Sequence, residues 1–154
     1  MIFALTLIAA LGTGLISGVF FIFSVAIMRA LERIPNGAAA MQSINVVIIN
    51  PMFLGVFLGT GIFCGALAVV SVMSWEQPGG KWLMAGALLY LIGSIGVTMV
   101  FNVPMNDALV SATLENLDRV WKDYLTNWTF WNHVRTVASL AASASFIAAL
   151  VYAR

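Results

Sequence analysis

The residues best suited to chemistry lie in the short segment 131–135, Trp-Asn-His-Val-Arg. It contains the only histidine of the chain, His133, and an imidazole readily accepts and releases a proton near neutral pH. On a helix, Trp128, Asn132 and Arg135 share one face, and His133 is turned about 100° from Asn132. A guanidinium and an amide side by side can stabilise an oxyanion. The segment therefore predicts a catalytic group with His133 as base and with Arg135 and Asn132 as oxyanion donors.

A second set of polar and aromatic residues is expected close to this segment. Aromatic walls with a few convergent polar groups are typical of a pocket for a flat, apolar small molecule. The candidates for binding such a substrate are Asn45, Asn102, Asn106, Asp107, Tyr124, Trp128 and Trp131. Structural interpretations stay open beside this one: Asn102 and Asn106 would cap helices, and Arg135 would reach lipid headgroups or pair with Asp107.

The composition indicates a membrane protein. Of 154 residues, 62% are hydrophobic and 8% are charged, and the mean hydropathy is +1.00, whereas soluble domains carry about 25% charged residues. The net charge of +1 and the lack of a basic run give no indication of a nucleic-acid partner. The single cysteine, Cys64, excludes a disulfide within the chain and a cysteine-rich metal site. The expected partner is the lipid bilayer.

Four segments are apolar over the roughly 20 residues that a spanning helix needs. They predict an all-α fold, an integral membrane four-helix bundle that forms a single transmembrane domain over residues 1–154. The first segment lacks a basic region at its start and stays apolar for too long to be a signal peptide, so we expect it to be retained. The expected spans are residues 1–28, 51–74, 81–101 and 133–152.

The connections between the spans are unequal. Residues 75–81 contain Pro-Gly-Gly and form a short turn. The other connections, 29–50 and 102–132, show apolar residues at helical spacing and predict short amphipathic helices on one membrane face. In the first of them, Pro35-Asn36 marks the helix start. Both long connections, and with them the candidate site residues, belong to the same end of the bundle.

The charges and the glycines add two expectations. The long connections carry most of the basic residues, so the positive-inside rule places them in the cytoplasm and the termini outside. Glycines four positions apart, such as Gly14/Gly18 and Gly61/Gly65, put small residues on one helix face and predict close helix packing. Such faces would serve a homo-oligomer as well as a single bundle.

Several stretches of the chain resemble the anthrone oxygenase-like family of small membrane proteins, whose bacterial members were catalogued as a domain of unknown function. The matching stretches cover most of the chain in the family's order. They are Gly18-Val-Phe-Phe-Ile-Phe-Ser24, Met41-Gln-Ser-Ile-Asn45, Asn50-Pro-Met-Phe53, Asn102-Val-Pro-Met-Asn-Asp107 and Trp128-Thr-Phe-Trp-Asn-His-Val-Arg-Thr136. The resemblance implies a four-span helical protein, and a bacterial member would lie in the inner membrane.

The resemblance also implies an activity, because some fungal relatives oxidise an anthrone to an anthraquinone with molecular oxygen. We therefore expect an enzyme, an oxygenase that acts on a lipophilic, anthrone-like aromatic molecule. Loss of a proton from the benzylic carbon of an anthrone gives a delocalised carbanion that can pass an electron directly to oxygen. His133 fits the base, and Arg135 and Asn132 fit the donors to the oxyanion. This mechanism requires no metal and no cofactor.

Other functions stay open. A single imidazole cannot build a multi-histidine metal site, but a haem or one metal ion could use His133 as its ligand. The protein could instead bind a small molecule, or act as a scaffold, without catalysis. Charged residues are absent from the middle of every expected span, which argues against a transport pathway.

Overall fold

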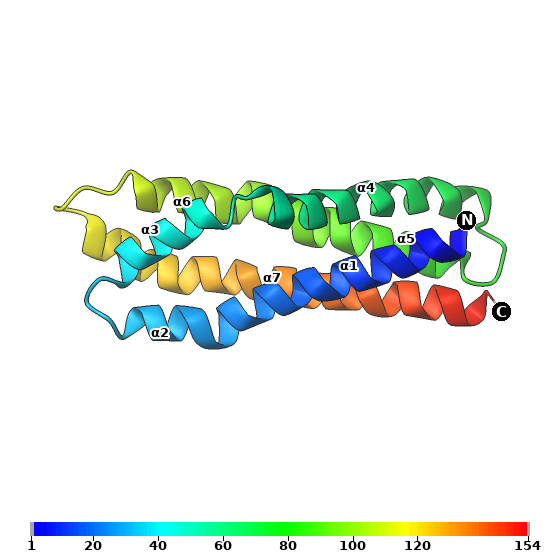
Figure 1. The fold of residues 1–154 in the computed structure, drawn as a ribbon, viewed down its shortest axis with the longest axis horizontal. Helices are drawn as coiled ribbons and strands as arrows, with labels where there is room; N and C mark the ends of the chain where they lie inside the picture. The colour runs from blue at the N-terminus through cyan, green and yellow to red at the C-terminus, as the bar shows by residue number, and fades with distance from the viewer. Residues whose placement is uncertain (1, 154) are drawn as a thin grey trace.

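The computed structural model describes residues 2–153 and shows four long antiparallel helices that run side by side (Figure 1). Each is long and apolar enough to cross a membrane, so the predicted all-α membrane fold is confirmed. Two of the long helices contain π-helical turns, labelled η. The long helices are Ile2–Glu32 (α1 Ile2–Ile22, η1 Phe23–Ile27, α2 Met28–Glu32), α4 (Pro51–Met73), Gly80–Val110 (α5 Gly80–Tyr90, η2 Leu91–Gly96, η3 Thr98–Asn102, α6 Val103–Val110) and α7 (Leu117–Tyr152).

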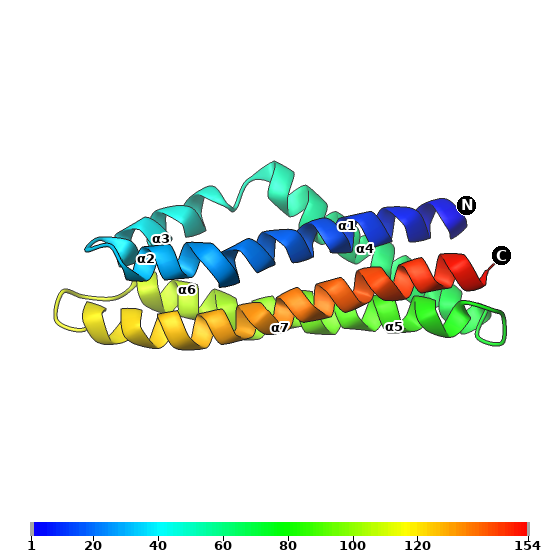
Figure 2. The ribbon, with the colours of Figure 1, turned by 90° about the horizontal axis from the view of Figure 1, so that it is seen from below.

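Both chain ends and the turn between α4 and α5 lie at one end of the bundle (Figure 1). The opposite end, called the loop-side end here, carries the two other connections. The first contains a separate helix, α3 (Gly37–Val47), as the sequence predicts. In Figure 2 the junction between α3 and α4 stands clear of the other helices, on the side of α1.

The second long connection differs from the prediction in one detail. Residues 117–132 do not form a separate amphipathic helix, because they are the first turns of the 36-residue helix α7. This stretch contains neither glycine nor proline, so nothing interrupts the ladder of backbone hydrogen bonds. The first and third long helices likewise continue past the expected span ends, to Glu32 and Val110. In these helices the apolar stretch of sequence is shorter than the helix itself, so hydropathy underestimates the length of the helix.

Local sequence explains where two of the elements begin. Asn50 caps α4, since its backbone is extended and its Oδ1 accepts a hydrogen bond from the Phe53 amide at 3.0 Å. Pro51 then occupies the first turn, where its missing N–H is not needed. At the other end of the bundle, Gly79 has a φ of +88° and reverses the chain before α5.

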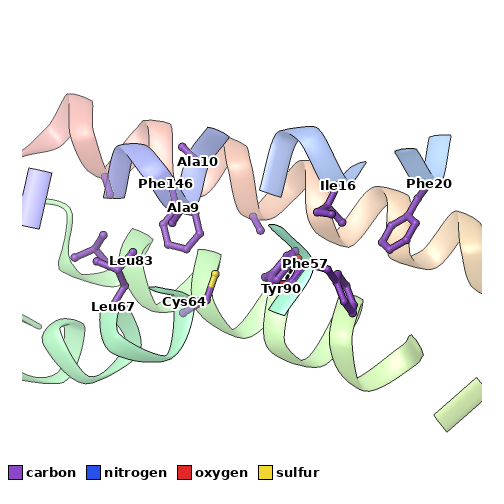
Figure 3. Close-up of a cluster of buried hydrophobic side chains, with 13 residues drawn as sticks. Ala9, Ala10, Ile16, Phe20, Phe57, Cys64, Leu67, Leu83, Tyr90 and Phe146 are labelled. Carbon is purple, nitrogen blue, oxygen red and sulfur yellow. Dashed lines mark hydrogen bonds between the residues drawn. The ribbon is translucent and has the colours of Figure 1, made fainter. Parts of the chain in front are cut away.

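The end of the bundle that carries the termini has an apolar core, shown in Figure 3. Small residues let helices approach closely there: a Cβ on Gly86 would meet the ring of Phe146. Tyr90 donates a hydrogen bond to the Phe57 carbonyl at 3.0 Å, the dashed line in Figure 3. The apolar core consists of Ala9, Ala10, Ile16, Phe20, Phe57, Cys64, Leu67, Leu83, Ala87, Tyr90, Ala142, Phe146 and Ala149.

The predicted role of the glycines is only partly correct. Gly14 and Gly61 face neighbouring side chains, and a Cβ on either would contact them. Gly18 and Gly65, their partners at a spacing of four, face open space with no atom within 4 Å of an added Cβ. Gly55 and Gly59, also four positions apart, both face open space, so within this chain one member of each of the first two pairs and neither member of the third serves helix packing.

A second cluster, the loop-side core, closes the other end of the bundle. It consists of Met28, Leu31, Ala38, Met41, Leu109, Tyr124 and Trp128. Gln42 fastens α3 to α6, since its Nε2 donates to the Leu109 carbonyl at 2.8 Å. The 36 residues of α7 extend for about 54 Å, well beyond the roughly 30 Å of a hydrocarbon layer. The helix α7 is therefore longer than the hydrocarbon layer is thick, and most of its charged residues lie in its first turns, at the loop-side end.

Candidate functional site

An apolar cavity of about 330 Å³ lies between the two cores. Its exposed apolar lining residues, Ile49, Leu58 and Met99, place its mouth on a surface suited to lipid. The volume lies within the roughly 300–1,000 Å³ of typical small-molecule sites. Aromatic and aliphatic side chains form most of the wall, including Phe20, Phe23, Met41, Ile44, Phe53 and Phe57. The lining residues that carry polar groups are Asn45, Thr98, Asn106, Trp128, Asn132 and Arg135.

Arg135 is the only charged residue in the lining of this cavity, and it is 95% buried. Its guanidinium donates to Thr98 Oγ1 at 3.1 Å and to Asn132 Oδ1 at 2.6 Å. It lies over the rings of Phe20 and Trp128, at 4.2 Å and 5.2 Å from their centroids. The expected pair with Asp107 does not form, because Asp107 is exposed and both hydrogen-bonded partners of Arg135 are neutral.

The hydrogen bonds leave the guanidinium with donors to spare. Its Nε is buried and has no partner among the described residues, and a guanidinium carries five N–H groups in a fixed plane. A buried cation without a counter-ion is costly. Nη1 and Nη2 each have a second N–H besides the one donated to Thr98 or Asn132. An oxyanion in the cavity would accept from these groups, and not from the fully buried Nε, and would offset the cost of the buried charge.

Asn132 fixes Arg135 in place and is itself fixed by α1. Its Nδ2 donates to the Phe20 carbonyl at 2.7 Å and to Ser24 Oγ at 2.6 Å. Both amide protons are therefore used, and the Oδ1 that remains accepts from Arg135. The Asn132 side chain is fully buried. It joins α1, α7 and the guanidinium in one rigid unit.

The π-helical turns lie beside this unit. Ser24 lies in η1, and Thr98 and Asn102 lie in η3. A π-helical turn is rare and is frequently found at functional sites. Thr98 donates to the Ser94 carbonyl at 2.8 Å while it accepts from Arg135, so its hydroxyl is oriented as an acceptor for the guanidinium.

A second polar group lies at the loop-side end of the cavity. Asn106 Oδ1 accepts from the hydroxyl of Tyr124 at 2.7 Å and from Trp128 Nε1 at 2.9 Å. Asn45 Nδ2 in turn donates to the Tyr124 hydroxyl at 3.4 Å. Asn102 Nδ2 donates to the Trp128 carbonyl at 3.2 Å and binds η3 to α7. Asn102 is thus buried inside a helix and does not cap one.

The structure brings together most of the predicted site residues, in different roles. Tyr124 and Asn102 support the cavity wall through hydrogen bonds, while His133, Asp107 and Trp131 lie outside it. Trp131 stacks on Phe101 at a centroid distance of 3.5 Å. The predicted residues that line the cavity are Asn45, Asn106, Trp128, Asn132 and Arg135.

His133 is exposed and lines a separate hollow of about 200 Å³ with Arg29, Glu32 and Ser24. Ser24 connects the two places, because its Oγ accepts from Asn132 in the wall of the apolar cavity. Glu32 is the only carboxylate in the lining of this hollow. Residues 2–153 contain no group of three His, Cys, Asp or Glu side chains able to hold a metal ion.

Sequence reasoning missed Thr98 and the cavity walls contributed by α4. Thr98 lies in a segment with the composition of a plain membrane span; in the structure it begins the π-helical turn η3 and accepts from Arg135. Phe53 and Phe57 line the cavity from α4. Their spacing of four predicts that both rings lie on one face of a helix. The same pattern is typical of residues that face lipid, so it does not by itself indicate a cavity wall.

The fold and the site together define the class of protein. It is an integral membrane four-helix protein with a cavity that is lined by aromatic side chains and has a buried arginine at one end. A family model described as anthrone oxygenase matches residues 52–145, more than half of the chain. The chain belongs to this family, and the resemblance found in the sequence is confirmed. The matched range contains Thr98, Asn106, Asn132 and Arg135, and family membership supports an oxygenase-type function. No curated protein and no solved structure matched the chain.

Proposed function

We propose that this protein is a membrane-embedded oxygenase that converts the ring methylene of a lipophilic, anthrone-like ketone to a carbonyl with molecular oxygen. The observation that carries the proposal is Arg135, a buried cation with neutral partners at one end of an aromatic cavity. An oxyanion that forms in the cavity would accept from the second N–H groups of Nη1 and Nη2. The proposed substrate supplies such an oxyanion when it loses a proton.

The shape and the surroundings of the cavity support a flat aromatic ligand. Phe20 and Phe57 meet edge to face with centroids 6.2 Å apart, and Phe53 stacks on Phe57 at 5.8 Å. Rings of this kind provide broad apolar contact at little cost in conformational entropy. A lipophilic substrate and dioxygen both partition into the bilayer, so a mouth among lipid-facing side chains would admit both.

The chemistry follows from where the ketone oxygen binds. With this oxygen on Arg135, loss of a proton from the ring methylene places the negative charge on that oxygen as an enolate. Fixed donors in a dry site stabilise developing charge strongly. The enolate passes one electron to O2, and the resulting pair combine at the ring carbon to give a hydroperoxide after protonation. Loss of water from the hydroperoxide gives the carbonyl, so CH2 and O2 become C=O and H2O.

The predicted base, His133, takes a different place in this proposal. Its imidazole lines the neighbouring hollow and not the apolar cavity. Ser24 and Asn132 form the wall between the two. We therefore propose that the substrate proton reaches His133 through the hydroxyl of Ser24, which takes up the proton while it gives its own hydrogen to the imidazole. His133 does not contact the ring carbon.

We further propose that the protein lies in a bacterial inner membrane with its loop-side end in the cytoplasm. Arg29, Arg33, Arg119 and Lys122 are all at this end, and basic residues favour the cytoplasmic side. An alkaline phosphatase fused after residue 154 should be active, because the C-terminus would be outside. A fusion placed in the turn at 111–116 should be inactive, and the reverse result would invert the orientation.

The activity is tested with the purified full chain in lipid nanodiscs and an anthrone as the probe. Wild-type protein should raise oxygen uptake well above the spontaneous oxidation measured with heat-inactivated protein. With ¹⁸O2, one labelled atom should enter the ring carbonyl and the other should leave as water. Unlabelled quinone would contradict the oxygenase proposal. Binding of the probe without oxygen uptake would leave only a binding function.

A further inference from the structure

The side chain of Asn106 can take only one orientation. Trp128 Nε1, 2.9 Å from Asn106 Oδ1, is an indole N–H that can donate but not accept. The atom that faces it must therefore be the amide oxygen, and the Tyr124 hydroxyl donates to the same oxygen. Asn45 donates to that hydroxyl and so orients it toward Asn106. The amide nitrogen of Asn106 consequently points away from these partners.

This amide nitrogen is available to a ligand. Asn106 lines the apolar cavity, and the only hydrogen bonds recorded for its side chain within residues 2–153 are those accepted by its oxygen. Fully buried polar atoms without a partner are found elsewhere in the described chain, but Asn106 Nδ2 is not one of them. This nitrogen is therefore accessible from outside the packed protein. An asparagine amide carries two N–H donors. Asn106 therefore brings to the cavity lining a fixed amide whose N–H donors no group of residues 2–153 uses.

Trp128 contacts both this donor's side chain and Arg135. The guanidinium lies over the face of the Trp128 ring, 5.2 Å from its centroid, and the Nε1 edge of the same ring contacts Asn106. The two polar groups of the cavity thus lie on different sides of one indole. A flat ring that packs in the cavity beside Trp128, with oxygen atoms at opposite positions, would direct one oxygen to each donor.

We infer that Asn106 donates a hydrogen bond to the oxygen atom that the reaction adds to the ring carbon opposite the ketone. The inference rests on the proposed function, in which the ketone oxygen binds Arg135. The methylene carbon then faces Asn106. When the enolate carbon and reduced O2 form the new C–O bond, negative charge appears on oxygen beside the Asn106 amide. The same donor serves the carbonyl that remains after water leaves.

Asn106 therefore acts on a different part of the reaction from Arg135. The substrate carries no oxygen at the Asn106 end, so this amide contributes little to substrate binding. The reacting oxygen and the product both carry one, so the amide contributes to turnover and to product affinity. A donor that is used only as the reaction proceeds lowers the barrier, and its removal lowers kcat with little change in KM.

The test compares Asn106→Leu with wild-type protein in nanodiscs. Steady-state oxygen uptake with an anthrone gives kcat and KM, and quenching of tryptophan fluorescence gives the affinities for anthrone and for 9,10-anthraquinone. Removal of one donor to an oxyanion typically lowers kcat by roughly a hundredfold or more. We expect such a loss in Asn106→Leu with KM changed by less than about threefold. The preference for the quinone over the anthrone should disappear.

Tyr124→Phe is the matched control for a merely structural role. It removes a hydrogen bond to the Asn106 oxygen but leaves the amide nitrogen in place. Its kcat should fall much less than that of Asn106→Leu, and its preference for the quinone should remain. If Asn106→Leu does not fold, Asn106→Asp keeps the acceptor for Tyr124 and Trp128 while removing the donor. It should lose the quinone preference in the same way.

The outcomes separate this inference from the proposed function. Wild-type protein that oxidises anthrone but binds anthrone and anthraquinone equally would overturn the role of Asn106 alone. So would equal losses of kcat in Asn106→Leu and Tyr124→Phe. Wild-type protein without oxygen uptake on any anthrone would instead remove the function on which the inference rests.

Discussion

The two ends of the bundle satisfy their buried polar groups in different ways. In the half that holds the apolar core, the side-chain donors are hydroxyls: Thr6 and Thr13 donate within their own helix at 2.9 Å and 2.8 Å, and Ser143 and Tyr90 donate to carbonyls of α1 and α4. At the loop-side end, the buried side chains that link helices include two amides: Asn132 donates to α1 and Asn102 to α7. A hydroxyl can be satisfied one turn away and imposes little on its neighbours. An amide has more donors than its own helix can take, so it fixes the distance between helices.

The difference also appears in what stays unsatisfied. In and near the apolar core, the hydroxyls of Ser71, Ser94 and Ser139 are buried without a partner, which is a modest cost for a neutral group. At the loop-side end, the unpartnered buried atoms are Asn102 Oδ1, Thr129 Oγ1 and the Nε of the Arg135 guanidinium. A buried charge costs far more than a buried hydroxyl. The comparison indicates that one half serves helix packing, and that the other half is suited to binding a negatively charged ligand.

The largest effect is expected from Arg135→Met. Loss of the cation should lower kcat/KM for anthrone oxidation by roughly 100-fold or more, because the enolate loses its main stabilising group. Stability should change little, because removal of a buried charge without a counter-ion offsets the loss of the hydrogen-bond donor to Asn132 Oδ1 and Thr98 Oγ1. Oxygen uptake and thermal unfolding followed by circular dichroism measure both effects. Arg119→Met, at an exposed position of the same helix, is the control and should change neither.

The opposite result for Arg135→Met would remove the distinction between the two halves. A large fall in melting temperature with normal activity in the folded fraction would make Arg135 a structural residue. The loop-side end would then serve packing in the same way as the apolar core.

The next effect is expected from Asn132→Leu, which breaks the unit that joins α1, α7 and Arg135. The substitution leaves Ser24 Oγ, the Phe20 carbonyl and one guanidinium nitrogen without the partner they now have. Each unsatisfied buried group costs about 1–3 kcal/mol, so both stability and activity should fall. Asn127→Leu, exposed on the same helix, should do neither. Equal melting temperatures for the two variants would show that the amide does not hold the helices together.

How much of this site the sequence could predict depends on the kind of signal. Helical spacing placed Trp128, Asn132 and Arg135 on one face, and the cavity uses that face. The same spacing turned His133 by about 100°, which is why it lines another hollow. Thr98 was not predictable, because a π-helical turn shifts the register that a 3.6-residue period assumes. The family resemblance identified the chemistry, but only the structure separates Arg135 from His133.

The fold was predictable from apolar length, and its boundaries were not. Hydropathy detects where a helix meets lipid, so it located four spans. It does not detect the part of a helix that lies outside the hydrocarbon layer, such as residues 117–132 at the start of α7. The cavity depends on that continuation, since Tyr124 and Trp128 lie on the part of α7 before the expected span.

A smaller effect is expected from His133→Ala. The imidazole does not line the cavity, so the affinity for anthraquinone, measured by fluorescence quenching, should be unchanged. Turnover should fall by about tenfold, because the substrate proton loses its acceptor. Since the hollow is open to solvent, added imidazole should restore much of the turnover. Full activity in His133→Ala without added imidazole would remove this residue from the mechanism.

The smallest effect on catalysis is expected in the apolar core, where the comparison predicts a change in stability alone. Gly86→Ala places a Cβ about 2.8 Å from the Phe146 ring. Phe146 is fully buried and cannot move aside, so the melting temperature should fall, by the equivalent of about 1–3 kcal/mol. Gly65→Ala is the matched control: its Cβ meets open space, and alanine favours a helix by up to about 1 kcal/mol over glycine, so stability should stay equal or rise. Folded protein of both variants should keep the wild-type kcat and KM, since neither glycine lines the cavity. A changed KM in Gly86→Ala would show that the packing of the apolar core reaches the cavity, and the two halves would then have to be treated as one unit.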